Sequence, residues 1–354
     1  MSTVIGVAAA LALVVVFAGM RDTVADMLDN QFTTIDLSDG QLLATDAVQV
    51  RGLLGVVRAD PEIASAEPIQ RVEVALSVGD HRCETLLVSM DSETTLHRFF
   101  NRDGQAVALP SGHGVLLGDG LRSTLHASVG DTVTIVVAGT GLEIREPIAA
   151  FVNEPMASIA YISANRPVSP TDSSGAGLLI RFAPGVDQHA AGHRLSALPG
   201  AAAWSGNRAT EATLRDAFAI MDVLVGVMFL FAVVLAGALL FNAMSANIAE
   251  RLVELGTLRA AGLSSRTIRR TVAVENLLLT VAALPLGLVV GTFVARWFMG
   301  QYENLGYRWS LSMRGSTYLW VVAGVLFAAA ASQLVVGRRV KHIEIAKIVR
   351  ERSL

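Results

Sequence analysis

The sequence has little cysteine and little lysine. Cys83 is the only cysteine among 354 residues, so the chain cannot form an internal disulfide and must be stabilised by packing. The two lysines, Lys341 and Lys347, both lie close to the C-terminus. A P-loop of the form G-x-x-x-x-G-K-[ST] needs a lysine directly after a glycine, and neither lysine has one. The chain therefore cannot bind ATP in the manner of a P-loop ATPase.

The sequence also lacks a motif for catalysis or for metal binding. His189 and His193 are four residues apart, as zinc ligands on a helix can be, but no glutamate follows the first histidine as in H-E-x-x-H. We interpret the two histidines as a solvated pair. The glycines between 112 and 120 do not have the spacing of a dinucleotide-binding loop. We therefore predict a non-catalytic protein that holds no metal and no cofactor of its own.

Charged residues are scarce as well. They make up 17% of the chain, against about 25% in soluble domains. Four long apolar blocks contain no Asp, Glu, Lys or Arg: Thr3–Met20, Val223–Phe241, Leu277–Ala295 and Tyr318–Val336. A helix of about 18 residues is about 27 Å long, close to the thickness of the hydrocarbon core of a bilayer. The sequence therefore predicts four transmembrane helices. A cleaved signal peptide is the alternative for the first block, and the lack of a basic leading segment argues against it.

The remaining charges are distributed unevenly. Segment 21–217 contains 14 Arg and 24 Asp or Glu, a net charge of −10. Segment 242–271 contains five Arg and two Glu (+3), and segment 338–354 contains six basic and two acidic residues (+4). Cytoplasmic segments next to membrane spans carry an excess of Lys and Arg. We therefore expect the large segment outside a bacterial plasma membrane and the C-terminus in the cytoplasm.

These patterns divide the chain into eight parts. They are transmembrane helix 1 (1–20), an extracytoplasmic domain with a stalk helix at each end (21–217), transmembrane helix 2 (218–241), a cytoplasmic segment (242–271), transmembrane helix 3 (272–296), an outer loop (297–317), transmembrane helix 4 (318–337) and a basic cytoplasmic tail (338–354). The fold class is a membrane α-helical protein with an inserted α+β domain between helices 1 and 2.

The extracytoplasmic segment shows both strand and helix signals. Short runs rich in Val, Ile and Leu predict strands at 71–78, 84–90, 131–137, 157–163 and 177–183. Apolar residues at helical spacing predict helices at 46–58, 118–127 and 187–198. The same spacing over 24–35 and 214–221 predicts that the first two membrane helices continue outward as the stalk. We expect an α+β domain, and a mobile loop at 165–177.

A basic segment punctuated by glycine, Ala249–Glu275, lies between the second and third apolar blocks. Gly256 and Gly262 allow helical pieces to come close together. Ser264 or Ser265 is suited to cap the helix that leads into the third block. Arg259 is suited to make directional hydrogen bonds with an acidic or carbonyl-lined groove. The segment is therefore a candidate contact for a cytoplasmic protein.

This segment resembles the signature of the FtsX/MacB/LolE-type ABC permeases, the FtsX-like permease family. In that family an E-[IL]-G-x-[LM]-[RK]-A-x-G-x-[ST] segment follows the second span and contacts the ATPase. The resemblance implies that these residues couple to an ATPase: Arg251, Glu254, Leu255, Gly256, Leu258, Arg259, Gly262 and Ser264. Segments 114–137 and 178–200 resemble the family's MacB-like periplasmic core, and 343–351 is similar to its closing segment.

The family usually has a basic helix before its first span, and this sequence does not show one. Two explanations stay open. The chain lacks its first residues, or it is the separated half of a larger double permease.

The resemblance implies a permease subunit that works with a separate ABC ATPase dimer, which uses ATP and magnesium. A symmetric ATPase pair requires a second permease subunit, in a homodimer or a heterodimer. ATP-driven motion would pass through the stalk to the outer domain and move or export a lipid, lipoprotein, peptide or drug by mechanotransmission. The alternative is a signal transducer that activates a cell-wall hydrolase or a sensor outside. An extracytoplasmic protein or lipidated cargo is a further expected partner, and no nucleic acid is expected.

Small residues form a stripe in the third apolar block. Ala283, Gly287, Gly291 and Ala295 recur every four residues. Such a stripe lets another helix approach closely. Packing inside the subunit and a seam between two subunits are both compatible with it.

Overall fold

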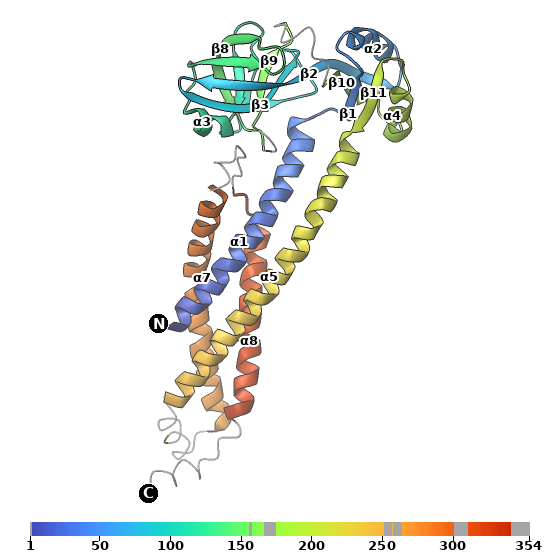
Figure 1. The fold of residues 1–354 in the computed structure, drawn as a ribbon. Coiled ribbons are helices and arrows are strands. Elements are labelled where there is room, and N and C mark those ends of the chain that lie inside the picture. The colour runs from blue at the N-terminus through green and yellow to red at the C-terminus, as the bar shows by residue number, and fades with distance from the viewer. Residues whose placement is uncertain are drawn as a thin grey trace. The chain divides into compact units, whose positions relative to one another are not determined.

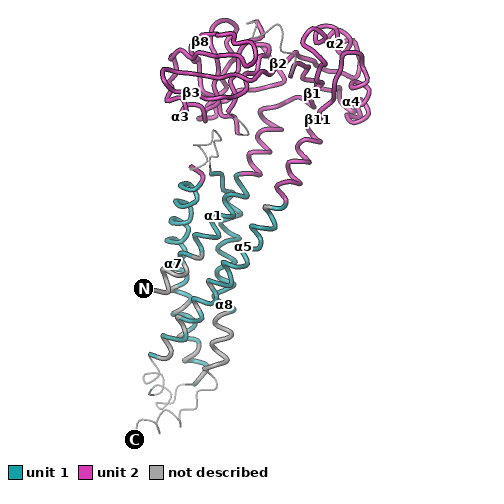
Figure 2. Tube along the Cα trace, viewed as in Figure 1, with its two compact units in different colours: residues 1–23, 220–298, 311–354 teal, residues 24–219, 299–310 magenta. Residues whose placement is uncertain are grey.

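The computed structural model describes residues 2–155, 158–165, 175–250, 257, 264–300 and 311–340. The chain forms two compact units (Figure 2). Unit 1 contains residues 1–23, 220–298 and 311–354, and unit 2 contains residues 24–219 and 299–310.

The described part of unit 1 consists mainly of segments of four long helices. They are α1 (Ser2–Asn30), α5 (Asn207–Glu250), α7 (Ser265–Gly300) and α8 (Gly315–Val340) (Figure 1). All four contribute to one apolar core, in which Leu11 and Val15 of α1 meet Ala232 of α5, Ala283 of α7 and Val325 of α8. The unit is therefore a bundle whose four helices share one packed interior.

The outer surfaces of these helices are strongly apolar. Two described segments are long and apolar enough to cross a membrane, Asn207–Leu239 and Ala273–Gly300, and Gly315–Ala331 is apolar but shorter. Along α5 the large apolar side chains are exposed, among them Val223, Leu230 and Phe231. A soluble protein rarely exposes so large an apolar face. The two segments agree with the second and third predicted spans, and the predicted total of four is not confirmed by length and hydropathy alone.

Unit 2 is built on one sheet of nine strands. Its strands are β1 (Gly40–Ala44), β2 (Ile63–Val78), β3 (His81–Met90), β6 (Val115–Gly118), β7 (Thr132–Val137), β8 (Glu143–Val152), β9 (Ala160–Ser163), β10 (Ala176–Phe182) and β11 (Ala201–Gly206). Their order is β11-β1-β10-β2-β3-β9-β6-β8-β7, and β7 also pairs with β2. That second pairing closes β2, β3, β9, β6, β8 and β7 into a barrel. A separate hairpin joins β4 (Phe99–Phe100) and β5 (Ala106–Val107).

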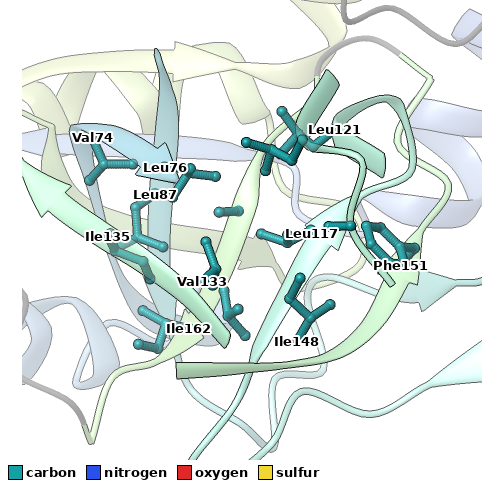
Figure 3. Close-up of a cluster of buried hydrophobic side chains, with 14 of the residues drawn as sticks. Val74, Leu76, Leu87, Leu117, Leu121, Val133, Ile135, Ile148, Phe151 and Ile162 are labelled. Carbon is teal, nitrogen blue, oxygen red and sulfur yellow. The ribbon is translucent and has the colours of Figure 1, made fainter. Parts of the chain in front are cut away.

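Alternate residues of the barrel strands fill its interior (Figure 3). Leu76 of β2, Ile135 of β7 and Ile148 of β8 are almost completely buried there. The period of two follows from strand geometry, because successive side chains point to opposite faces. Helix α3 (Gly120–Leu125) adds Leu121 to the same cluster. The barrel is therefore a packed core and not a channel.

The second lobe of unit 2 consists of β11, β1, β10 and the first half of β2. Two amphipathic helices, α2 (Gln49–Arg58) and α4 (Gln188–Ser196), contribute to its core. Gly192 allows α4 to lie directly on an indole ring, since a Cβ there would come within 2.3 Å of Trp204. A larger residue at 192 would push this helix away from β11.

Strand β2 is common to both lobes. Residues 63–70 pair with β10, and residues 69–78 pair with β3. Strands β10 and β3 lie on opposite edges of β2, so Ile69 and Gln70 are paired on both edges. Further along, residues 74–77 pair with β7 on the edge that β10 has left. One continuous backbone therefore links the barrel to the second lobe.

Most elements predicted for segment 21–217 are present in unit 2. All five predicted strand segments form strands, and the three predicted helices correspond to α2, α3 and α4. Residues 21–35 are helical as predicted, in α1 and in the π-helical turn η1 (Gln31–Ile35). Strands β1, β6, β8 and β11 and the first half of β2 were not predicted. Most of the expected mobile loop, 166–174, lies outside the described residues.

We expect Ile135→Ala to destabilise the barrel. Removal of buried methyl groups from a closed core costs about 2–5 kcal/mol. Cys83 provides the readout in the full-length protein in detergent, because it packs against the barrel core and burial raises the pKa of its thiol, which slows labelling while the barrel is folded. The urea concentration for half-maximal labelling should fall clearly. Val129→Ala is the control, since Val129 is 56% exposed; an equal shift in both variants would contradict the assigned core.

Candidate functional site

The predicted coupling segment lies between α5, which ends at Glu250, and α7, which begins at Ser265. Among the predicted coupling residues, Ser264 is described. Arg251, Glu254, Leu255, Gly256, Leu258, Arg259 and Gly262 lie outside the described residues, as does the predicted closing segment 343–351. The structure therefore defines the two helices on either side of the site and its last residue.

Ser264 caps the N-terminus of α7. Its Oγ accepts a hydrogen bond from the backbone N–H of Thr267 at 3.2 Å, three residues on, and the two hydroxyl oxygens are 2.9 Å apart. A serine cap of this kind stabilises a helix by about 1 kcal/mol. The cap fixes where α7 begins, and so ends the coupling segment at a defined residue.

Exposed arginines follow the cap. Arg266 and Arg270 are exposed in the first turns of α7, which has no acidic residue in its first turn. Positive charge near a helix N-terminus is unfavourable because it opposes the helix dipole. These arginines therefore do not serve the stability of α7, and they present positive charge beside the coupling segment.

The stripe of small residues on α7 packs against α1. Ala283 and Ala295 are at most 1% exposed. A Cβ at Gly287 would come within 2.5 Å of Leu11, and one at Gly291 would come within 2.8 Å of the backbone of Ala12. Close helix packing inside the subunit thus accounts for the stripe, and a seam between subunits is not needed to explain it.

A buried polar contact joins α1 to the start of α8. The Asp22 carboxylate is 5% exposed, and its Oδ2 accepts hydrogen bonds from the backbone N–H of Arg314 at 3.1 Å and from the Thr317 hydroxyl. Thr23 accepts a hydrogen bond from the N–H of Ser312 at 3.1 Å. A carboxylate at the N-terminus of α8 also favours the helix dipole. Sequence reasoning did not identify this contact, because nothing in the sequence relates residue 22 to residue 314.

A second polar contact involves Arg21, the residue before Asp22, and joins α1 to α5. Arg21 Nε lies 2.6 Å from Asp222 Oδ1, with both side chains more than half exposed. Exposed ion pairs contribute at most about 1 kcal/mol. The partner of Asp222 is thus a surface cation, and not a group inside the bundle.

No group of three or more His, Cys, Asp or Glu that could hold a metal ion occurs among the residues that the structure describes. The rings of His189 and His193 contact each other, with centroids 4.7 Å apart. Two histidines alone do not make a closed metal site.

An apolar helical bundle, a predicted coupling segment that ends at the Ser264 cap of α7 and a two-lobed α+β domain are together typical of a membrane protein of the ABC permease class. Residues 1–198 match the family model of the MacB-like periplasmic core domain, and residues 226–345 match that of the FtsX-like permease C-terminal domain. The chain belongs to the FtsX/MacB-type ABC permeases. The family is embedded in the membrane with a periplasmic domain, and it associates with an ABC ATPase.

Solved structures are similar to parts of the chain. The periplasmic region of MacB from Actinobacillus actinomycetemcomitans is 12% identical, covers 51% of this chain and 94% of its own length, and gives a TM-score of 0.34. The extracellular domain of the noncanonic ABC-type transporter YknZ from Gram-positive bacteria is 10% identical. Its match covers 44% of this chain and 92% of its own length, with a TM-score of 0.32. A search of the curated proteins finds no match.

We expect Gly291→Ala to destabilise the bundle, although alanine favours helix formation by about 1 kcal/mol over glycine. The new methyl group would collide with the backbone of α1, and overpacking of this kind costs about 1–3 kcal/mol. The midpoint of thermal unfolding in detergent should fall. Gly226→Ala on α5 should leave it unchanged or raise it, because a Cβ there meets nothing within 4 Å. Shifts of the same sign in both variants would contradict the α1–α7 contact.

We also expect Asp22→Ala to loosen the first turn of α8. The substitution removes the charged acceptor of two part-buried hydrogen bonds, at a cost of about 1–3 kcal/mol. Hydrogen exchange of the amides of residues 314–318, followed by mass spectrometry on the full chain, should become at least tenfold faster. Asp222→Ala removes an exposed carboxylate and serves as the control. Unchanged exchange in Asp22→Ala would refute its role as a cap.

Proposed function

We propose that this chain is the permease subunit of an ABC transporter. It couples ATP hydrolysis by a separate ATPase dimer to the movement or export of a lipid, lipoprotein, peptide or drug on the outer side of the membrane. In this proposal, the coupling residues around Glu254 and Arg259 dock on the ATPase, which binds the ATP and magnesium. The chain itself binds no cofactor. A second permease subunit, identical or related, completes the transporter.

The continuity of α5 is the observation that carries this proposal. Helix α5 begins at Asn207, directly after β11 ends at Gly206, and runs to Glu250, directly before the coupling segment. Its 44 residues correspond to about 66 Å, and they include the residues on both sides of the division between unit 2 and unit 1. An unbroken helix transmits a displacement at one end to the other, as mechanotransmission requires.

The outer end of α5 is firmly attached to the sheet. The backbone N–H of Asn207 donates to the carbonyl of Asp39 at 2.8 Å, and its side-chain Nδ2 donates to the carbonyl of Ser38 at 2.9 Å. Both acceptors directly precede β1. Arg215, two turns further along α5, pairs with Asp29 of α1 at 2.6 Å. Movement of α5 would therefore pull on β1 and on the end of α1 together.

The membrane topology supports the same proposal. We propose that α1, α5, α7 and α8 all cross the bilayer, because all four contribute to one apolar core. With four spans, the net charges of the connecting segments favour the large domain outside and the C-terminus in the cytoplasm. This is the orientation in which the segment after α5 faces a cytoplasmic ATPase.

We expect Glu254→Ala and Arg259→Ala each to lower the stimulated activity of the partner ATPase at least tenfold while membrane insertion stays normal. Loss of charge-assisted hydrogen bonds at the contact is the physical reason. The measurement is ATP hydrolysis by the reconstituted complex, with and without the permease. Glu84→Ala and Arg51→Ala, exposed residues of unit 2, are the charge-matched controls.

Full stimulation in both coupling variants would refute the assigned contact. A pull-down of the intact complex tests the type of output: a bound lipid or lipoprotein supports transport, and a bound cell-wall hydrolase favours the signalling alternative.

A further inference from the structure

Unit 2 contains a cavity of about 290 Å³ at the junction of its two lobes. Strand β2 passes along it with Ile69 and Arg71, near the position where pairing with β10 on one edge of the strand ends and pairing with β3 on the other edge begins. The π-helical turn η1 contributes Gln31, and β1 contributes Gln41. Short π-helical turns are rare and frequently occur at functional sites. The cavity is thus bordered by both lobes and by the helix end that enters them.

Much of the cavity wall is apolar. Ile69, Val88, Met90 and Leu179 line it, and each is at most 4% exposed. Ligand sites in proteins combine such walls with a small number of polar groups that fix the orientation of the ligand. The size is near the lower end of the range for small-molecule sites, about 300–1,000 Å³. The wall accommodates a short apolar chain.

Arg71 supplies the charge in this cavity. Its Nη1 donates to Gln41 Oε1. No carboxylate within the described part of the chain lies within ion-pair distance of it, and burial lowers the pKa of its guanidinium. An arginine has five N–H donors in a planar fork that fits a carboxylate. Arg71 is partly buried, and among the described residues its guanidinium has one hydrogen-bond acceptor, Gln41, so that other donors of the fork are open to a ligand.

Two amide atoms of the cavity also lack a partner in the described part of the chain. Gln41 Nε2 and Gln31 Oε1 are buried and have no hydrogen bond to any described residue. Buried polar atoms in folded proteins are almost always paired, with protein, water or ligand. Since Gln41 Oε1 is occupied by Arg71, its Nε2 is a free donor adjacent to the guanidinium.

The acidic groups of the cavity are already paired by the protein. Glu154 Oε1 lies 3.3 Å from His97 Nε2, and burial together with the nearby Glu154 raises the pKa of Tyr161. Asp36 Oδ1 accepts hydrogen bonds from the N–H and the hydroxyl of Ser38. Each carboxylate therefore has a polar partner of its own, although the charge of Asp36 also acts on Arg71. Among the described residues, Arg71 and Gln41 Nε2 are left with donors that a ligand acceptor can satisfy.

We propose that this cavity binds a small amphipathic carboxylate, whose head accepts hydrogen bonds from Arg71 and Gln41 and whose short apolar chain lies against Ile69, Val88 and Met90. Gln31 Oε1 provides an acceptor for a hydroxyl on the same ligand. The inference does not depend on the ATPase contact, which is formed by other residues and is measured separately.

The test uses the full-length protein in detergent and a hexanoate analogue with a diazirine at the end of its chain. After irradiation, peptide mass spectrometry should place the label on residues of β2, β3 or β10 that line the cavity. Unlabelled hexanoate should compete, and hexanol should compete at least tenfold less well. Hexyl phosphate separates the possible sources: if it competes better than hexanoate, the oxyanion belongs to a phosphate ester such as a lipid headgroup, and the carboxylate assignment is wrong.

Arg71→Gln should reduce labelling in the cavity at least tenfold. Arg82→Gln is the matched control, because Arg82 is an exposed arginine on β3. Gln41→Met removes the second donor at similar size and should also reduce labelling. It keeps the test valid if Arg71→Gln disturbs the fold, which is judged by the protection of Cys83. No labelling of the cavity, equal competition by hexanol, or full labelling in both Arg71→Gln and Gln41→Met would overturn the proposal.

Discussion

The hydrogen-bonded ladder along β2 is the interaction on which the outer domain depends. Its first half pairs with β10, and its second half pairs with β3 and, through β7, closes the barrel. Each backbone N–H and C=O in a buried sheet must find a partner, so the two lobes cannot separate without breaking this strand. The shared strand also borders the cavity, because Ile69 and Arg71 lie where its pairing with β10 ends.

Unit 1 depends on a different constraint, the lack of a side chain at two glycines of α7. Gly287 and Gly291 let the backbones of α7 and α1 approach until a methyl group no longer fits. Dispersion at this short distance is what holds helices together where the hydrophobic effect between them is weak. Asp22 then fixes the start of α8 against α1. Close packing of this kind suits the transmission of force that we propose for the bundle.

The sequence predicted much of the architecture, and the failures have physical causes. The five predicted strands are β-branched or leucine-rich, and their own composition identifies them. Strand β11 is largely Ala and Gly, and β2 contains Pro68 among polar residues over its first half. Such segments have low intrinsic strand propensity and become strands because neighbouring strands pair with them. The small-residue stripe was found from its spacing, whereas its partner α1 was not.

By itself, the sequence determined the apolar segments and the α+β character of the large domain, and it carries the patterns from which the orientation and the coupling contact are proposed. These features reside in local composition and spacing, which the chain carries whatever its fold. Only the tertiary structure decided the closure of the barrel through β7 and β2, the contact of α7 with α1, and the cap that Asp22 provides to α8. It also brought Gln31, Gln41 and Arg71 together around one cavity. Such contacts join residues far apart in the chain, and their energy depends on distances of a few ångströms that no local pattern encodes.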